Sequence, residues 1–297
     1  MRQHQGRIER HALRAGLADP DEPEGDQRQR HEEGDADGQP GAAADARQVL
    51  SDRLEVLEDA DVELDREPDR EGDAILLLNP DAYLRDPDAV AVALAHLDAH
   101  PQVGAVGLRL VFEDGRHQVG DAGFEPRPLT VAVHAAGLSG RFGLRGVYLS
   151  GGQARAPGPV SVDWLCGAFL MLRREAVEAI GGLSSPLFLY GEDVDWGCRV
   201  RDAGWRVEYL PDRSVVHLQG GSGSTRSPRW LDGLAGVYRL RNGGRRLSSP
   251  AFFAVPLWLG FTARAAVYGL LGRLRRRPDL LGRSRDMKRF ADHLTNI

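Results

Sequence analysis

The first 74 residues contain no Phe, Trp, Tyr, Cys, Thr, Asn or Lys, and only one Ile and one Ser. Arg, Asp, Glu, Gly, Ala, Gln and Pro make up most of this stretch. Such a segment buries too little apolar surface to offset the ordering of its backbone, which costs about 1 to 2 kcal/mol per residue. These absences exclude an ordinary globular core. We therefore expect residues 1–71 to be a low-complexity charged segment that is disordered or at most a lone helix.

Cysteine and lysine are also scarce, with Cys166, Cys198 and Lys288 as the only examples. Two cysteines make no disulfide framework and no metal-ligand spacing links them, so we expect a reducing, cytoplasmic setting. With 38 basic and 43 acidic residues, the formal net charge is −5, which argues against a general nucleic-acid binder. The amino terminus has no apolar stretch of signal-peptide length, so secretion by that route is not expected.

From residue 75 onward, strand-like and helix-like periods alternate, which is the pattern of an α/β domain. The expected elements begin with a strand at 75–78, a helix capped by Asp86 and ending before Pro101, and a hairpin at 102–119 turning at 113–115. A long loop at 120–160 follows. After it we expect a buried strand and short helix at 162–182, a helix from Glu192 or Asp193 to Gly204, and short strands at 206–211 and 214–218.

The apolar run of the first strand stops at Asn79, Pro80 and Asp81. Asn-Pro followed by Asp is ordinary turn chemistry, and a strand has to end somewhere. The other interpretation is that Asp81 is held at the carboxyl end of a sheet strand, where open α/β sheets bind their ligands. Both interpretations stay open at this point.

Three acids, Glu192, Asp193 and Asp195, stand at the start of an expected helix, where unpaired N–H groups stabilise anions. Capping needs only one of them, and the preceding run "LFLY" would hold them at the edge of a core. A carboxylate in that position is a reasonable general base for a sugar hydroxyl. His217 follows a strand and is either an ordinary satisfied polar residue or, if it faces Asp81, a second ligand to a divalent ion.

The carboxyl end carries the apolar stretch "AFFAVPLWLGFTARAAVYGLL", followed by a cluster of arginines. Arg264 and Pro256 disfavour a helix that spans the bilayer. One interpretation is an amphipathic helix at the membrane surface, with the arginines facing anionic head groups. The other is a buried carboxy-terminal helix with a solvated basic tail. Residues 246–297 are expected to be a helical tail, which is membrane-associated under the first interpretation.

The order of "ILLLNPDA", "VDWLCGAFLMLRREAVEAIGGL" and "LFLYGEDVDWGCRVRDAGWRVEYLPDRSVVHLQGGS" closely resembles the family 2 glycosyltransferases, in the bacterial branch with rhamnosyltransferases and galactofuranosyltransferases. The resemblance implies a GT-A fold, a Rossmann-like mixed sheet flanked by helices, over residues 72–245. It implies transfer of a sugar from a nucleotide-sugar donor, such as dTDP-rhamnose or UDP-galactofuranose, to a saccharide or polyprenyl-linked acceptor. The protein would then work at the cytoplasmic face of the cell membrane, as a peripheral enzyme of cell-wall or polysaccharide synthesis.

The resemblance also assigns residues. Asp81 and His217 would hold Mg²⁺ or Mn²⁺ on the donor diphosphate, with Asn79 beside them. Asp193 would be the general base of an inverting displacement, supported by Glu192. The remaining residues expected to contact substrate are Asp195, Trp164, Gly167 and Trp196.

The chain departs from the family before residue 72, where the expected base-binding and ribose-binding motifs are absent. Because this stretch has about the right length but the wrong content, one hypothesis is that it is read in a shifted frame. The domain would then be incomplete at its amino terminus, and strand 75–78 would lack its normal sheet neighbours. The alternative function is an inactive remnant that binds only a membrane or a partner.

Overall fold

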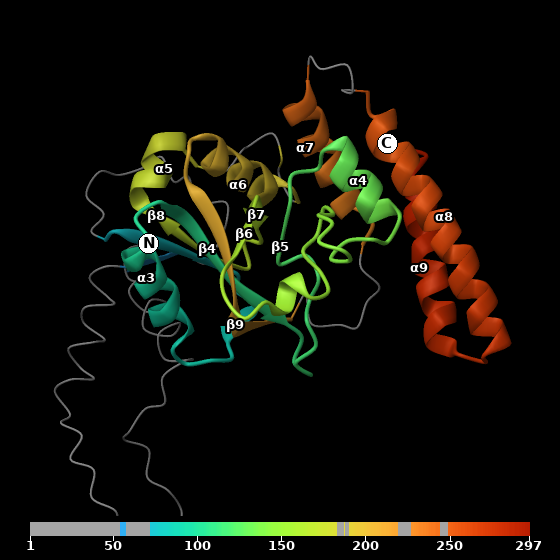
Figure 1. The fold of residues 1–297 in the computed structure, drawn as a ribbon, viewed down its shortest axis with the longest axis horizontal. Helices are drawn as coiled ribbons and strands as arrows, with labels where there is room; N and C mark the ends of the chain where they lie inside the picture. The colour runs from blue at the N-terminus through green and yellow to red at the C-terminus, as the bar shows by residue number, and fades with distance from the viewer. Residues whose placement is uncertain (1–53, 58–71, 183–186, 188–189, 219–226, 244–248) are drawn as a thin grey trace, which may run out of the picture.

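The computed structural model of this protein describes residues 54–57, 72–182, 187, 190–218, 227–243 and 249–297. Within that part of the chain, seven strands form a mixed sheet in the order β1-β2-β8-β4-β9-β3, with β6 also paired to β9 (Figure 1). These strands are β1 (Leu54–Leu57), β2 (Ala74–Leu78), β3 (Ala82–Leu84), β4 (Val103–Val111), β6 (Val160–Val162), β8 (Phe169–Arg173) and β9 (Arg206–His217). A small second sheet pairs β5 (Ala122–Gly123) with β7 (Trp164–Leu165).

Helices cover both faces of the main sheet, which confirms the expected mixed sheet flanked by helices. On one face, apolar residues of α3 pack against β2, β4 and β8, and on the other, α5 and α6 do so. A third core lies among α4, α7, α8 and α9. The helices are α3 (Ala89–Ala99), α4 (Pro128–Ala135), α5 (Arg174–Ile180), α6 (Glu192–Asp202), α7 (Trp230–Asn242), α8 (Ala251–Leu274) and α9 (Pro278–Leu294), with a 3₁₀ turn η1 (Gln153–Arg155).

The expectation that strand 75–78 lacks neighbours is wrong. Strand β1 pairs in parallel with β2, from Leu54 opposite Ala74 to Leu57 opposite Leu77. Strand β8 pairs with the other edge of β2 in antiparallel register. The rest of the segment expected to be disordered or frame-shifted, residues 1–53 and 58–71, lies outside the described residues.

Residues 120–160 are not one long loop, as the weak periodicity predicted, because they contain β5, α4, η1 and the start of β6. Pro128 stands in the first turn of α4, and the backbone N–H of Arg127 donates to the Thr130 hydroxyl. Val131 and Ala135 of this short helix are buried in the core shared with α8. Tertiary packing, which eight residues of sequence do not reveal, therefore stabilises α4.

The structure also corrects the two strands expected at 206–211 and 214–218 and the expected cap of α3. The expected strands at 206–211 and 214–218 form one strand, β9, whose pairing with β4 jumps from Leu210 to Ser214 across an irregularity. Asp86 does not cap α3; its carboxylate accepts hydrogen bonds from the backbone N–H and hydroxyl of Ser214 instead. Asp88 is the residue at the cap of α3, and its carboxylate pairs with Arg213.

The carboxy-terminal region is helical, as expected, but it is a hairpin of α8 and α9 that packs into the protein. The rings of Trp230 on α7, Phe261 on α8 and Phe290 on α9 contact one another edge-on or tilted. Gly260 allows α8 to approach α4, since a Cβ there would lie 2.1 Å from the carbonyl oxygen of Ala135. The hairpin therefore shares a core with the domain that precedes it.

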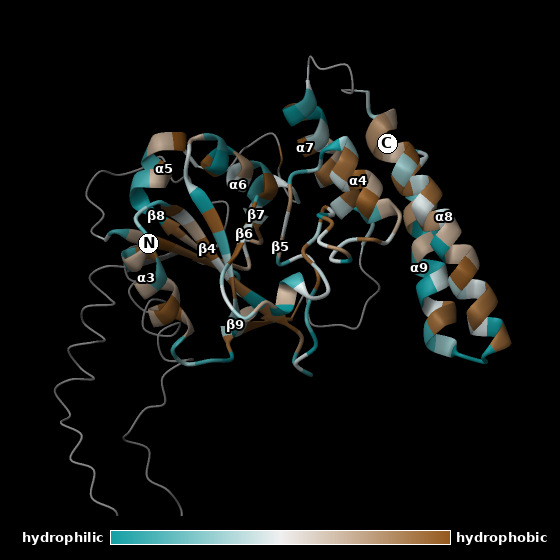
Figure 2. Ribbon diagram, viewed as in Figure 1, coloured by the Kyte–Doolittle hydropathy of each residue, from teal (hydrophilic) through white to brown (hydrophobic). Residues whose placement is uncertain are grey.

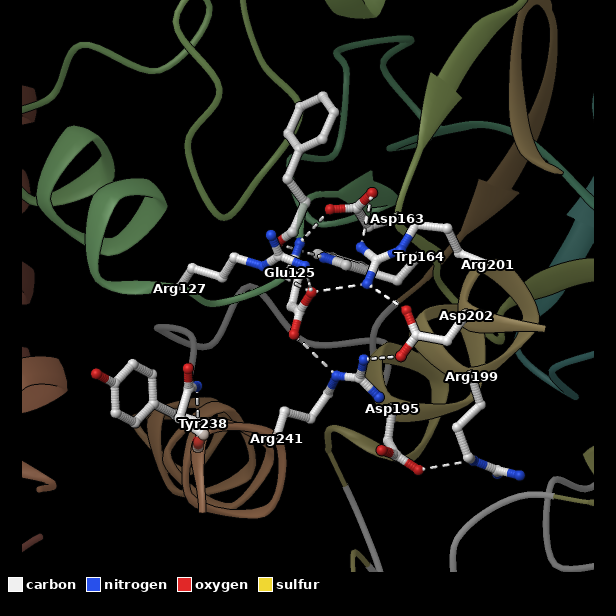
Figure 3. A network of polar contacts seen from close by, with 12 residues as sticks. Glu125, Arg127, Asp163, Trp164, Asp195, Arg199, Arg201, Asp202, Tyr238 and Arg241 are labelled. Atoms are coloured by element: carbon white, nitrogen blue, oxygen red, sulfur yellow. Dashed lines mark hydrogen bonds and ion pairs between the residues drawn. The ribbon is translucent and has the colours of Figure 1, made fainter. Parts of the chain in front are cut away.

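A buried network of ion pairs joins the segment before α4 to α6 and α7 (Figure 3). Glu125, only 2% exposed, accepts hydrogen bonds from Arg127, Arg201 and Arg241. Burial alone would raise the pKa of the Glu125 carboxyl, but the hydrogen bonds from the three arginines outweigh it and lower the pKa to about 2. Arg241 also pairs with Asp202 of α6, so the network fixes α7 against α6.

Candidate active site

Several loops meet at one edge of the main sheet. The pairing pattern makes β2, β4 and β9 run in the same direction, with β8 antiparallel between β2 and β4. The carboxyl ends of these three strands and the amino end of β8 therefore lie at the same edge, the usual ligand position of such sheets. The backbone N–H of Asn79 donates to the carbonyl of Ala168, and that of Leu218 donates to the carbonyl of Asp81. The expectation that Asp81 follows the carboxyl end of a sheet strand is confirmed.

Asp81 and His217 face each other at this edge. Nε2 of His217 lies 3.3 Å from Oδ1 of Asp81, and the side-chain amide nitrogen of Asn79 lies 3.4 Å from the same Nε2. Burial lowers the pKa of His217, and the charge of Asp81 only partly opposes this effect. The pKa of His217 therefore lies below the ordinary value for histidine. The structure thus brings together the three residues that the sequence assigned to this cluster.

The residues present fit a divalent cation in part. Among the described residues, no group of three or more His, Cys, Asp or Glu side chains is placed to hold a metal ion. Mg²⁺ and Mn²⁺ sites on sugar nucleotides need fewer, because one or two protein ligands are completed by phosphate oxygens and water. The carboxylate of Asp81 and the imidazole of His217 fit such a site, and the imidazole favours the transition metal Mn²⁺.

Asp193 lies in the first turn of α6, beside the break between β7 and β8. The backbone N–H of Gly167 donates to its Oδ2 at 3.2 Å, and the N–H of Val194 donates to its Oδ1 at 2.8 Å. Burial raises the pKa of the Asp193 carboxyl, while these hydrogen bonds oppose the rise. Apart from Gly167 and its two chain neighbours, no atom lies within 4 Å of where a Cβ of Gly167 would be, so the space on that side of Gly167 is open.

The backbone of residues 166–168 joins the cluster of Asp81 and His217 to the acids of α6. Ala168 accepts the hydrogen bond from Asn79, and its neighbour Gly167 donates to Asp193. Burial and then the negative charge of Asp193 raise the pKa of the Cys166 thiol, with Glu192 among the smaller contributors, so that thiol stays protonated. The break at residues 166–168 therefore lies between the Asp81 cluster and the acids of α6.

The start of α6 is built from an unusual turn. Tyr190 has φ of 71° and Gly191 has φ of 107°, and a non-glycine residue in this region stores backbone strain. A Cβ at Gly233 of α7 would lie 1.9 Å from the carbonyl oxygen of Tyr190, so only glycine allows this approach. Glu192 follows directly as the first residue of α6 and is half-buried.

Three residues expected to contact substrate lie elsewhere. Trp164 is 2% exposed and donates its indole N–H to the carbonyl of Phe124, and Trp196 is 0% exposed and donates to the carbonyl of Gly181. Both indoles are part of the hydrophobic core, so neither lines a sugar site. Asp195 is buried and pairs with Arg199, one turn further along α6, at 3.0 Å.

His117, Gln118 and Asp121, in the segment that follows β4, also lie at this edge of the sheet. The sequence did not single them out. Asp121 is buried, and its Oδ2 accepts hydrogen bonds from the Tyr209 hydroxyl at 2.9 Å and from Nε2 of His117 at 2.8 Å. Its backbone carbonyl accepts a hydrogen bond from Cys166. Gln118 bonds His217 directly. Their only signal in the sequence is a cluster of polar residues at the end of the hairpin expected at 102–119 and just after it.

A family model described as "Glycosyltransferase like family 2" matches residues 55–233, more than half of the chain. The chain belongs to this family. The family expected from the three motifs is confirmed, and the match begins at β1, upstream of the expected boundary at residue 72.

Curated relatives of this family 2 chain include rhamnosyltransferases, the branch that the motifs resemble. The N-acetylglucosaminyl-diphospho-decaprenol L-rhamnosyltransferase of Mycobacterium tuberculosis is 31% identical over 147 residues, which cover 49% of this chain and 47% of the relative. The O-antigen biosynthesis protein RfbC of Myxococcus xanthus is 29% identical over 163 residues, covering 51% of this chain and 11% of that protein. The chain thus spans less than half the length of these relatives.

Among solved structures, a mannosyltransferase from Pyrobaculum calidifontis in complex with GDP-Man and Mn²⁺ aligns with a TM-score of 0.42 and 18% identity. The alignment covers 76% of this chain and 61% of the mannosyltransferase. A score at that level carries no conclusion about ligands.

Proposed function

We propose that this family 2 protein is a glycosyltransferase that moves a sugar from a nucleotide-sugar donor to a saccharide or lipid-linked saccharide acceptor. The observation that carries the proposal is the meeting of Asp81, His217 and Asp193 at one sheet edge, next to open space over Gly167. The names of the relatives, which include L-rhamnosyltransferases, support a deoxysugar donor and a role in cell-wall or polysaccharide synthesis.

Asp193 is the general base of the proposed reaction. Its carboxylate takes the proton from the acceptor hydroxyl, whose oxygen attacks the anomeric carbon while the nucleoside diphosphate leaves from the opposite face. This single displacement inverts the configuration at that carbon. Gly167 and Val194 orient the carboxylate through their N–H groups, and partial burial raises its proton affinity.

Asp81 and His217 hold the diphosphate end of the donor in this proposal. Mg²⁺ or Mn²⁺ bound between them would neutralise the charge that develops on the leaving diphosphate. Asn79 keeps the Nε2 side of His217 turned toward Asp81 through its side-chain amide.

The test is transfer from dTDP-rhamnose and UDP-galactofuranose to a lipid-linked saccharide, with and without Mn²⁺. Asp193→Asn should lower kcat by at least about 100-fold with donor binding kept. Asp81→Asn should weaken donor binding when Mn²⁺ is present and change little in its absence. Asp114→Asn, a matched change at an exposed ion pair with Arg116, should leave activity unchanged. Absence of nucleotide binding by calorimetry would instead support the inactive remnant.

We further propose a peripheral contact between α8 and the cytoplasmic membrane surface. By length and composition alone, α8 is long and apolar enough to cross a membrane. Its buried side, however, packs in the core through Phe253, Leu257 and Phe261, which favours a helix lying on the membrane. Figure 2 shows hydrophobic residues along α8. Its exposed apolar side chains are Phe252, Val255, Trp258, Leu259, Val267, Leu270 and Leu274.

Arginines at the hairpin turn support this contact because they can bind anionic head groups. They are Arg273, Arg275, Arg276 and Arg277. In liposome flotation, Leu259→Ser with Leu270→Ser should reduce binding to anionic vesicles, whereas Leu240→Ser on the exposed face of α7 should not. Equal flotation of all variants would refute the contact.

A further inference from the structure

Gln118 lies just after the turn that follows β4 and is 3% exposed. Its backbone N–H donates to the carbonyl of Leu110, which holds it beside the end of β4. Its side chain reaches across to His217 at the end of β9. The amide nitrogen donates to the backbone carbonyl of His217 at 3.0 Å, and Oε1 lies 2.7 Å from Nδ1 of the same residue.

These two contacts fix the direction of the amide. A backbone carbonyl only accepts hydrogen bonds, so the nitrogen of Gln118 must face it, and Oε1 must then face the imidazole. Oε1 is also only an acceptor, so Nδ1 of His217 must carry the hydrogen. A neutral imidazole carries one N–H, which leaves Nε2 of His217 with a lone pair.

That lone pair points into the cluster with Asp81. Nε2 lies 3.3 Å from Oδ1 of Asp81, so two electron-pair donors converge, with the Asn79 amide as a nearby hydrogen-bond donor. Without a cation, Nε2 accepts a hydrogen bond from the Asn79 amide. In the same orientation its lone pair, together with the Asp81 carboxylate, is available to a cation.

We propose that Gln118 is a positioning residue, which holds His217 in the Nδ1–H tautomer and so presents Nε2, together with Asp81, to a divalent cation. The inference rests on the proposed function for the assignment of Asp81 and His217. It adds the residue that orients the imidazole, in the way that outer hydrogen bonds orient metal-binding histidines generally. Loss of such a partner typically weakens metal binding by about 10- to 100-fold.

The experiment compares Gln118→Leu with Gln118→Glu. Leucine removes the acceptor for Nδ1–H, whereas glutamate keeps an acceptor there, loses the donor to the His217 carbonyl and adds a negative charge. Binding of Mn²⁺ alone is measured from the electron paramagnetic resonance signal of the free ion. Gln118→Leu should weaken Mn²⁺ binding about 10- to 100-fold, and Gln118→Glu should restore most of it.

Nitrogen-15 NMR of histidine-labelled protein reports the tautomer directly, with the His217 signals assigned by their loss in His217→Asn. The wild type should show Nδ1–H at neutral pH without metal, and Gln118→Leu should shift the signals toward Nε2–H. Because the wild-type spectrum needs only the His217→Asn variant for its assignment, the tautomer is tested even if Gln118→Leu does not fold.

An Nε2–H wild-type ring overturns the inference, as does Mn²⁺ binding by a folded Gln118→Leu variant within twofold of wild type. Absence of Mn²⁺ binding by the wild type also overturns it. If Mn²⁺ binds as expected but no nucleotide sugar is consumed, the proposed function fails while this inference stands.

Discussion

The Glu125 network allows a quantitative prediction about stability. Glu125 is 2% exposed, and its pKa falls from an ordinary value of 4.5 to about 2 in the folded protein. A group with a lowered pKa stabilises the folded state above its unfolded pKa, and this contribution is lost as the pH falls through the folded pKa. The difference corresponds to about 3 kcal/mol at pH 7.

Glu125→Gln keeps the shape of the side chain and removes the charge, leaving Arg201 and Arg241 with a neutral partner at that position. We expect the free energy of unfolding at pH 7 to fall by about 3 kcal/mol, within the range seen when one member of a buried ion pair is removed. At pH 3 the unfolded chain is already protonated at this position, so the difference between the two proteins should shrink to about 1.4 kcal/mol.

Urea unfolding followed by circular dichroism at pH 7 and pH 3 measures both differences. Asp114→Asn, at an exposed ion pair with Arg116, is the matched control and should show no difference at either pH. A loss below about 1 kcal/mol at pH 7, or a difference independent of pH, would show that Arg127, Arg201 and Arg241 do not stabilise the Glu125 charge.

Three further predictions follow from single contacts. Because Asp193 must be ionised to act as a base and burial raises its pKa, kcat should fall as the pH is lowered, with its acid limb above the ordinary aspartate range in a pH–rate profile. Gly260→Ala should lower the free energy of unfolding by about 1 to 3 kcal/mol, since its Cβ would meet the carbonyl of Ala135, whereas Gly282→Ala, which faces open space, should not. Tyr209→Phe, which removes a buried hydrogen bond to a carboxylate, should cost about 1 to 3 kcal/mol in thermal unfolding, and an unchanged melting temperature would argue against that bond.

The sequence was informative where a strand ends on a polar residue. Apolar runs stop just before Asp81 and His217, and the family resemblance assigned both residues to one metal site. The structure places them 3.3 Å apart where the carboxyl ends of β2 and β9 meet at one edge of the sheet. The α/β alternation likewise predicted β2, α3, α5 and α6, but not the short strand β3.

What could not be predicted depended on register and on distant packing. The predicted hairpin at 102–119 returns Gln118 beside Leu110, but Gln118 reaches His217 only because β9 pairs with β4, and no local pattern encodes that distant pairing. A tryptophan in the sequence looks the same whether its side chain lines a sugar site or fills a core, so the sequence did not distinguish these two roles for Trp164 and Trp196. Trp164 is buried because it lies in β7 opposite Gly123 of the second sheet, and Trp196 is buried because α6 packs against the main sheet.

The three acids at the start of α6 show how one cluster in the sequence divides into different roles. Asp195 points along its own helix, where Arg199 at the next turn neutralises it. The carboxylate of Asp193 is held instead by the backbone N–H groups of Gly167 and Val194. These hydrogen bonds lower its pKa less than burial raises it, so the carboxylate keeps the raised proton affinity that a base requires. Capping alone does not explain this division, whereas a base beside a diphosphate site does.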